Sequence, residues 1–440
     1  MIICEVSLWG RAVGVLAYAE DSRYATFEFM PEFVNEGIDI APLKMPLSNP
    51  DRVYTFPSLS WETYKGLPAV FADTLPDDFG NAVINAWLAR EGRDIGSFTP
   101  LERLLYVGTR SMGAFEYHPA IKTKIKTADN LQLDSLVKMA QSVLDSRENL
   151  EGRIDASADA LGDIIQVSTS AGGARAKALV AINHDRTVIK SGQVDAPDGF
   201  DHFLLKFDGV REHSKGRETF GDPLGYGRME YAYYRMAKDA GITISDSELL
   251  MDGKRAHFLT KRFDRKGNKK ILYQSLCAMD HADFKKPGMY SYEQLFGVMR
   301  SLKLSREDAI ELYRRMAFNV VARNHDDHTK NFGFIMTGPE SNWRLAPAFD
   351  IAYSYKPGSE WVNSHQLTLS GKRDNFTRED ILDVGLKMIG KFKRKEAEAI
   401  LDNVVSVVSE WDSYSKQAGV FDDLSETIKN NLRLYLGQLR

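Results

Sequence analysis

Asp326-Asp-His-Thr-Lys-Asn331 follows an apolar helical stretch and leads, through a short strand-like segment, to Phe349-Asp350. An aspartate, an asparagine five residues later and a second aspartate after a short strand come in the order of a kinase catalytic loop. In such a loop one carboxylate faces the attacking hydroxyl, while an amide oxygen and another carboxylate hold magnesium against the phosphates. The stretch therefore predicts a Mg-nucleotide site for phosphoryl transfer.

The composition is that of an ordinary globular chain. It has 440 residues, 43% of them hydrophobic, which is enough for large cores in two to three domains. The net charge is −4, the pI is about 6.2, and no run of five or more Lys or Arg occurs. We therefore expect no direct, non-specific binding of nucleic acid, and a role at DNA would need a basic partner.

Cysteine usage and hydropathy bear on the compartment. Cys4 and Cys277 are too few and too far apart for a disulfide framework or a cysteine zinc site, a pattern that suits a reducing cytoplasm. The N-terminus lacks a basic leader, and no stretch approaches about 18 uninterrupted apolar residues. We expect a cytoplasmic chain that is neither secreted nor membrane-spanning.

The pattern of apolar residues predicts an α+β chain in three parts. Strands are expected at 4–9, 24–29, 177–182, 203–207 and 256–263, and helices at 81–90, 133–144, 229–240, 292–302, 306–323, 378–389, 394–411 and 425–439. Ser305 with Asp308 and Thr377 with Asp380 are expected to cap two of these helices. A polar segment at 145–159 marks the main boundary.

We predict the following domains: an N-terminal mixed α/β subdomain at 1–145, a strand-rich small lobe at 146–285, and an all-helical C-terminal lobe with the catalytic loop at 286–440. A small strand-rich lobe before a helical lobe is the layout of a bilobal, protein-kinase-like fold. Such a fold needs a strand lysine for the α and β phosphates and a helix carboxylate to orient it. Lys206 and Glu230 supply both, although a solvated strand lysine and a glutamate favoured by a helix N-terminus are the plain alternatives.

Backbone N–H donors for the phosphates need a loop of small residues. Ser168-Thr-Ser-Ala-Gly-Gly-Ala-Arg-Ala-Lys177 lies just before a predicted strand and has such residues, although it is neither a Walker A motif nor a GxGxxG loop. A Ser/Gly run of this kind is otherwise a plain turn. The glycines from Gly221 to Gly227 are interpreted as a connection before a helix.

These motifs together resemble the HipA-family serine/threonine kinases, which are toxins of bacterial toxin–antitoxin modules linked to persistence. The resemblance spans nearly the whole chain, because the motifs occur in the family's order. The matching stretches are 71–77, 107–114, 170–177, 203–206, 230–234, 262–265, 326–332 and 349–351.

The resemblance implies roles for residues of the predicted catalytic loop and its surroundings. Asp326 would position or deprotonate the acceptor hydroxyl, and Asn331 and Asp350 would hold Mg²⁺, with Asn331 also touching ATP. Lys206, oriented by Glu230, would bind the ATP phosphates. Residues from Lys261 to Phe263 would line the adenine pocket, although relatives often carry Glu where Lys261 stands.

The resemblance also assigns the Ser/Gly loop. The ATP-binding residues implied there are Ser170, Ala171, Gly172, Gly173 and Ala174. Ser170 aligns with the serine that family members autophosphorylate, and Ser168 is a second candidate. A phosphoserine adds nearly two negative charges where the ATP phosphates must lie, so its formation would switch the kinase off. Relatives often carry Gln where Arg175 stands.

The implied cofactors are ATP and Mg²⁺, and the implied partners are a helix-turn-helix antitoxin, operator DNA mainly through that antitoxin, and a protein substrate such as an aminoacyl-tRNA synthetase; no membrane partner is expected.

Two alternatives stay open. Small-molecule kinases of the aminoglycoside or choline type share the Asp-x-His-x-x-Asn order of Asp326, His328 and Asn331. A catalytically silent subunit that only binds the antitoxin is the other alternative. A zinc site at His325 and His328 would need further spaced ligands.

Overall fold

The structure is a computed structural model, and it describes residues 1–19, 22–49, 51–121, 130–146, 163–165, 167, 175–210 and 223–437. Contacts within the chain divide it into two compact units. Unit 1 comprises 1–227, 248–273 and 337–340, and unit 2 comprises 228–247, 274–336 and 341–440. The predicted domain boundaries at residues 145 and 285 stay a prediction.

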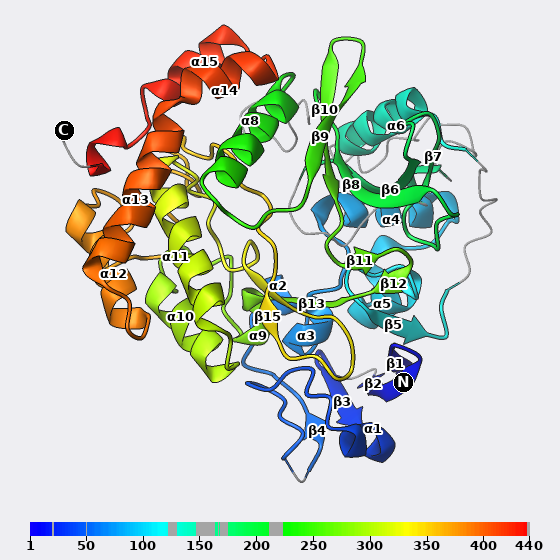
Figure 1. Ribbon diagram of the computed structural model, residues 1–440. Coiled ribbons are helices and arrows are strands. Elements are labelled where there is room, and N and C mark those ends of the chain that lie inside the picture. Colours follow the sequence, from blue (N-terminus) through cyan, green and yellow to red (C-terminus); the bar gives the residue numbers. More distant parts are fainter. Residues whose placement is uncertain are drawn as a thin grey trace. The chain divides into compact units, whose positions relative to one another are not determined.

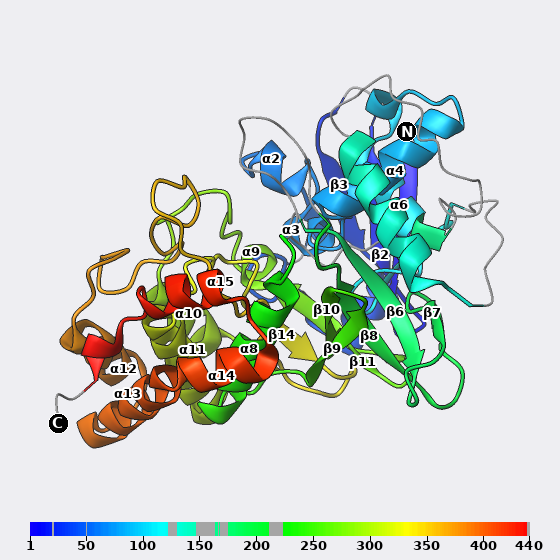
Figure 2. The same ribbon diagram turned by 90° about the horizontal axis from the view of Figure 1, so that it is seen from above.

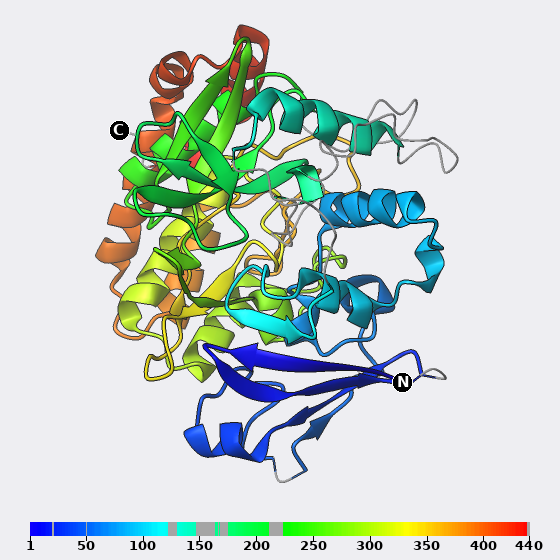
Figure 3. The same ribbon diagram turned by 90° about the vertical axis from the view of Figure 1, so that its right-hand side faces the viewer.

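The first sheet of unit 1 is antiparallel and has the strand order β4-β3-β2-β1-β5. Its strands are β1 (Ile2–Leu8), β2 (Arg11–Tyr18), β3 (Ala25–Phe29), β4 (Val53–Tyr54) and β5 (Phe115–His118). They are the dark-blue and cyan arrows in the lower half of Figure 3. Gly14 is required in β2, because a Cβ there would lie 2.2 Å from the carbonyl oxygen of Glu28 on β3. Every second side chain of β1 from Cys4 to Leu8 is fully buried, so the predicted strand at 4–9 is confirmed.

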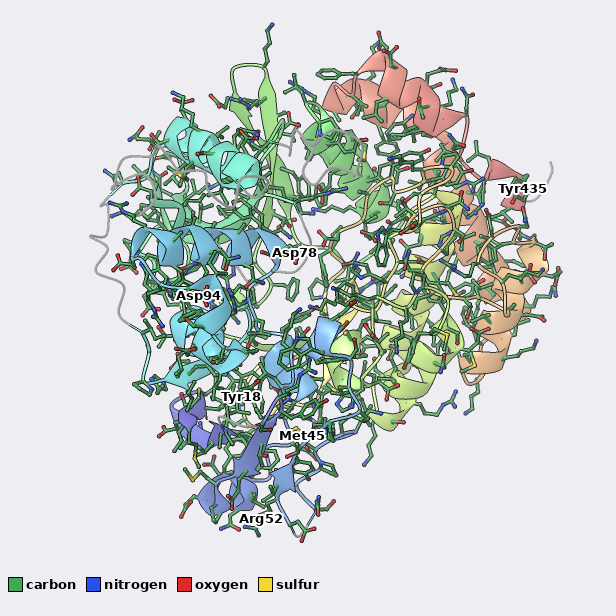
Figure 4. All side chains as sticks on the ribbon, turned by 180° about the vertical axis from the view of Figure 1, so that it is seen from behind. Tyr18, Met45, Arg52, Asp78, Asp94 and Tyr435 are labelled. Atoms are coloured by element: carbon green, nitrogen blue, oxygen red, sulfur yellow. The ribbon has the colours of Figure 1, made fainter. Side chains whose placement is uncertain are left out.

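Helices of unit 1 connect and cover its sheets. Those helices are α1 (Pro31–Glu36), α2 (Trp61–Tyr64), α3 (Ala69–Ala72), α4 (Asp78–Arg90), η1 (Ile95–Ser97), α5 (Pro100–Val107) and α6 (Leu133–Ser146). Asp78, labelled in Figure 4, opens α4, and Asp77 caps the helix by accepting the N–H of Gly80. In α6 the buried residues recur at helical spacing, from Leu136 to Leu144.

The second sheet of unit 1 has the order β7-β6-β8-β10-β9. Its strands are β6 (Lys177–Asn183), β7 (Ile189–Ser191), β8 (Phe200–Lys206), β9 (Ser247–Asp252) and β10 (Arg255–Lys261), and a ribbon of β11 (Arg265–Lys266) and β12 (Lys269–Lys270) follows. One hydrophobic core joins α4 and α6 to β6, β8 and β10 (Figure 1). Because β6 is buried on both faces, it forms a nearly continuous apolar run.

Unit 2 is mainly helical. Its helices are α8 (Tyr226–Asp239), which begins at the boundary, α9 (Leu276–Met279), α10 (Tyr292–Ser301), α11 (Arg306–Val321), α12 (Arg378–Met388), α13 (Arg394–Ser409), α14 (Trp411–Ala418), α15 (Asp422–Lys429) and η2 (Leu434–Leu436). A small sheet of β13 (Leu272–Ser275), β14 (Gly333–Met336) and β15 (Arg344–Leu345) accompanies them. The predicted lobe at 286–440 is therefore not all-helical, because β14 and β15 lie within it. The predicted caps are confirmed, since Ser305 with Asp308 and Thr377 with Asp380 form capping boxes.

Two predicted helices at the C-terminal end were wrong in extent. The stretch 394–411 belongs to two helices that meet at Glu410 (Figure 2), because Trp411 turns inward and donates its indole N–H to the carbonyl of Ser425. The stretch 425–439 is not one helix: α15 ends at Lys429, and the chain then turns so that the N–H of Arg433 bonds to the carbonyl of Val321. Tertiary hydrogen bonds override helical spacing in both places. None of the described helices is both long and apolar enough to cross a bilayer.

Candidate active site

The predicted catalytic loop lies in unit 2, between α11 and β14. The helix ends at Val321, and the chain leaves it through Arg323, whose positive φ of 57° breaks the helical path. Within α11, Glu311 and Arg315 form a buried ion pair with an N–O distance of 2.9 Å. Glu311 also accepts the N–H of Thr243, and Arg315 donates to the carbonyl of Ala346, so this pair fixes α11 to two neighbouring segments.

The structure brings Asp326 and Asn331 together, as their spacing predicts. The Asn331 amide nitrogen donates to the main-chain carbonyl of Asp326 at 2.7 Å, and the Asn331 N–H donates to the carbonyl of His328. The Asp326 side chain is 43% exposed, and its carboxylate lies 3.7 Å from Nε2 of His328. The loop is therefore a closed turn that presents one carboxylate outward.

Asp327, in contrast to Asp326, has a buried carboxylate, which the sequence analysis did not predict. Its side chain is fully buried, and its Oδ2 accepts hydrogen bonds from the hydroxyl of Tyr292 at 2.7 Å and from Nδ1 of His365 at 2.8 Å. Its Oδ1 accepts the N–H groups of Gln366 at 2.8 Å and Leu367 at 3.4 Å. Four donors hold this carboxylate in a single orientation.

The far end of the loop is fastened to the segment around α9. Thr329 donates its hydroxyl to the carbonyl of Ala282 at 2.5 Å, and the N–H of Cys277 bonds to the carbonyl of Thr329. The N–H of Leu276 bonds to the carbonyl of Phe332. The backbone from Asp327 to Phe332 is thus held at both ends.

Asp350 lies at the same end of the β14–β15 hairpin as Asn331. Strand pairing and a bond from the N–H of Ala346 to the carbonyl of Gly333 align the two strands, so the residue before β14 and the residues after β15 share one end. Asp350 has a φ of +51°, a left-handed conformation that is uncommon outside glycine and is concentrated at functional sites. The role of Asp350 in holding a metal stays a prediction.

The two histidines of this region lie in different environments. His325 is fully buried, with Nδ1 3.1 Å from the carbonyl of Val362, and burial lowers its pKa far below the usual value. His328 faces Asp326, and its ring contacts the ring of Phe284 in a tilted arrangement with the ring centres 5.4 Å apart. Among the described residues, no group of three or more His, Cys, Asp or Glu side chains is placed so that it could hold a metal ion.

In unit 1, Lys206 lies at the end of β8 and is only 5% exposed. Its strand neighbours are Lys177 on β6 and Phe258 on β10, and its ammonium lies 5.7 Å from the centre of the Phe258 ring. Lys177, also buried, lies 3.4 Å from Asp77, and burial raises the pKa of Asp77 to about 6 despite that lysine. The ends of β6 and β8 thus carry two buried lysines on paired positions, one of which has Asp77 as its counter-ion.

The start of α8 is fixed next to β8 and β10. Asp208, just after β8, accepts the N–H groups of Gly225 and Gly227 with one oxygen and that of Ala256 with the other. A Cβ on Gly227 would lie 2.0 Å from the Ala256 carbonyl oxygen, so only glycine fits there. Glu230 follows on α8 and is 3% exposed, which argues against a solvated glutamate.

Around 261–265 the structure separates two kinds of residue. Lys261 is half-exposed and its ammonium pairs with Asp201 at 2.8 Å, while Phe263 contacts the ring of Tyr273. Arg262 and Arg265 instead hold the fully buried Asp264. The Arg-Phe-Asp-Arg motif is therefore mainly a structural ion cluster, and Lys261 and the partly exposed Phe263 lie beside it.

The loop residues Ser168, Ser170, Ala171, Gly172, Gly173 and Ala174 lie outside the described residues. Their predicted roles in ATP binding and autophosphorylation stay predictions.

Comparison with known proteins identifies two matching families, a related protein and a similar solved structure. The HipA N-terminal domain family matches residues 4–118, and the family of HipA-like C-terminal domains matches residues 169–411. A Haemophilus influenzae protein named "Putative kinase" is 30% identical over 154 residues, which are 32% of this chain; the match spans 44% of that protein's length. The Shewanella oneidensis HipA structure, solved with HipB and operator DNA, is 13% identical, aligns over 98% of this chain and 95% of that one, and gives a TM-score of 0.64.

The full-length structural match shows that the fold is the same, and it confirms the predicted α+β, kinase-like class. One family match alone covers more than half of the sequence, and the second accounts for most of the part before it. The chain therefore belongs to the HipA family.

Proposed function

We propose that this chain is an ATP- and Mg-dependent serine/threonine protein kinase that acts as the toxin of a toxin–antitoxin module. The observation that carries the proposal is the turn in which Asn331 bonds to the carbonyl of Asp326. A kinase loop needs that turn, because it orients an outward carboxylate and a metal-binding amide from one short segment. The kinase name of the Haemophilus influenzae relative agrees with it.

Asp326 is the residue that orients or deprotonates the acceptor hydroxyl. Its side chain is accessible at 43%, whereas the carboxylate of its neighbour Asp327 already has four donors. General-base work needs a carboxylate with unused lone pairs within reach of the acceptor. Of the two adjacent aspartates, Asp326 alone meets that requirement.

The residues present fit a magnesium ion. The Asn331 amide uses its nitrogen for the Asp326 carbonyl, which leaves its oxygen as a ligand atom, and Asp350 adds a carboxylate. Oxygen donors from an amide and a carboxylate suit Mg²⁺, which is usually held by one or two protein groups together with substrate phosphates. When bound, the ion neutralises the charge that develops on the phosphates.

Nucleotide binding is assigned to the residues that the sequence predicts for it. Lys206 carries a buried charge suited to the α and β phosphates, and Glu230 carries a buried carboxylate suited to orienting a lysine. Lys261 and Phe263 contact the adenine, and the loop from Ser170 to Ala174 supplies N–H donors. Phosphorylation of Ser170, or of Ser168, places negative charge in this loop and stops turnover.

A protein acceptor, an antitoxin and DNA complete the proposal. The Shewanella oneidensis HipA was solved with HipB and operator DNA, and we infer a helix-turn-helix antitoxin partner for this chain also. The net charge of −4 favours contact with operator DNA mainly through that partner. The proposed acceptor is a translation component such as an aminoacyl-tRNA synthetase.

The test is phosphosite mapping and intact mass after incubation with Mg-ATP. Wild type, Asp326→Asn and a control, Asp412→Asn, are compared; Asp412 forms an exposed ion pair with Lys429 and has no part in the loop. We expect one added phosphate at Ser170 or Ser168 in wild type and control, and none in Asp326→Asn. Phosphate in Asp326→Asn at the wild-type rate would remove Asp326 from the mechanism.

A small-molecule kinase is the second candidate, because His328 lies beside Asp326 as the Asp-x-His-x-x-Asn order demands. Phosphate transferred to an aminoglycoside or choline, with none on serine or threonine, would support it. ATP binding without any transfer would instead support a silent subunit that binds the antitoxin.

A further inference from the structure

A buried polar relay lies behind the catalytic loop, and it begins in the C-terminal segment. We call Arg433, His365 and Asp327 the Arg433 relay. Arg433 follows α15 and is 1% exposed. Its Nη1 lies 2.9 Å from Nε2 of His365 and 2.9 Å from the carbonyl oxygen of Val320 in α11, while Tyr435, two residues on, lies at the surface (Figure 4).

The chemistry of arginine fixes the direction of every bond in the relay. A guanidinium only donates, so Nε2 of His365 must accept and carries no proton. The ring proton is therefore on Nδ1, which donates to Oδ2 of Asp327 at 2.8 Å. Hydrogen bonds run in one direction, from Arg433 through His365 to the carboxylate of Asp327.

Arg433 also contacts a second histidine, His325, which lies just before Asp326. Nη2 of Arg433 lies 3.3 Å from Nε2 of His325, so that ring also accepts and is neutral. The rings of His325 and His365 lie 4.2 Å apart. Asp374 accepts a further bond from Nη2 and compensates the buried charge of Arg433.

The relay ends one peptide unit from the proposed catalytic residue. The carboxylate of Asp327 holds the backbone of residues 366 and 367, and the N–H of Gln366 also lies 3.2 Å from the carbonyl of His325. A shift of Asp327 therefore moves the main chain on both sides of Asp326. Displacements of about 1 Å at such a point are enough to reduce turnover strongly.

We propose that Arg433 is a positioning residue for Asp326, which it fixes through His365 and Asp327. The inference rests on the proposed kinase function. It makes the segment after α15 part of the active-site architecture. Without Arg433, the two histidine Nε2 atoms and the carbonyl of Val320 lose their buried donor, and His365 can take the other tautomer, which cannot donate to Asp327.

The test compares Arg433→Ala with Arg378→Ala in steady-state kinetics. Arg378 is a matched control, because it fastens the same segment through the carbonyl of Leu436 and Asp402 but does not contact the relay. We expect Arg433→Ala to lower kcat roughly ten- to a hundredfold, as loss of a supporting hydrogen bond does elsewhere, with KM for ATP within about twofold. Ethylguanidinium, but not ethylammonium, should restore part of kcat.

Three outcomes would overturn the inference: a kcat that stays within about twofold of wild type, an equal loss in Arg378→Ala, or a loss that ethylguanidinium does not reverse. If Arg433→Ala does not fold, His365→Asn replaces it. An asparagine keeps a donor near Asp327 and loses the acceptor for Arg433, so kcat should fall while ATP binding persists. Unchanged kcat in folded His365→Asn overturns the inference equally.

Failure of the proposed function is recognised separately. A wild-type chain that transfers no phosphate to any acceptor refutes the kinase proposal, and the relay is then tested by amide hydrogen exchange at residues 325–331. Faster exchange in Arg433→Ala than in Arg378→Ala is expected. Equal exchange in the two variants would show that Arg433 does not position the loop.

Discussion

Replacing Asp264 by asparagine should destabilise unit 1 severely. Asp264 is fully buried and accepts two bonds from Arg262, at 2.8 and 2.7 Å, one from Arg265 at 2.8 Å and one from the N–H of Gly113 at 2.8 Å. Its pKa is held far below its usual value, because the two guanidinium groups more than offset the cost of burial. An asparagine removes the charge and turns an NH₂ group toward donors.

The expected magnitude follows from the charges that remain. Arg262 and Arg265 are 4% and 9% exposed, so both would be buried cations that have lost their direct counter-ion. Breaking a buried pair in this way costs about 3–5 kcal/mol in the free energy of unfolding. For a unit of this size, about 1 kcal/mol shifts Tm by roughly 2–4 °C, so the Tm of unit 1 should fall by roughly 6–20 °C.

The assay is thermal unfolding of the full chain, with Glu248→Gln as control. Glu248 forms a partly exposed pair with Arg186 in the same unit, and its loss should change stability by about 1 kcal/mol or less. The pH dependence of the stability difference between wild type and Asp264→Asn is a second readout. A depressed pKa contributes stability above about pH 4 that is lost as the pH falls, so the difference between wild type and Asp264→Asn should shrink in acid. A Tm within about 2 °C of wild type at pH 7 would refute the reasoning.

Three further predictions concern the rest of unit 1. The pKa of Asp77 is raised from 3.8 to about 6, so between these pH values the folded state keeps a proton that the unfolded state has lost. The free energy of unfolding should therefore fall as the pH rises from about 4 to about 6. Urea titrations at several pH values should show this slope in wild type and not in Asp77→Asn. Lys206→Met should lower Mg-ATP affinity roughly ten- to a hundredfold in calorimetry with little change in Tm; unchanged affinity would exclude Lys206 from the phosphate site. Gly227→Ala should destabilise by about 1–3 kcal/mol, although alanine favours helices, because its Cβ would meet the Ala256 carbonyl; a higher Tm would contradict this.

The parts of the site that the sequence predicts are those encoded locally. Asp326 and Asn331 lie five residues apart, and the hydrogen bond that joins them forms within one turn of chain. Capping boxes are local in the same sense, and both predicted ones occur. Residue spacing therefore predicts the features that form within a short segment, independently of contacts with distant segments.

The missing parts depend on contacts between distant segments. His365 and Arg433 lie 38 and 106 positions after Asp327, and neither stands in a pattern typical of a functional residue. The predicted helix at 425–439 fails for the same reason, since Arg433 leaves the helical path to bond to Val320 and Val321. A single sequence offers no signal for such pairs.

In the proposed mechanism, the two adjacent aspartates of the loop have different functions. In an irregular loop, neighbouring side chains can point in opposite directions, so one can be buried while the other is accessible. A carboxylate with four donors cannot serve as a base, and one without fixed neighbours cannot keep its orientation toward a hydroxyl. Asp327 is held by its donors, and Asp326 is accessible. Because one peptide bond joins the two residues, the fixed position of Asp327 also restricts the backbone of Asp326. On this reasoning Asp327→Asn should lower kcat as Arg433→Ala does, while Asp326→Asn abolishes turnover without disturbing the fold.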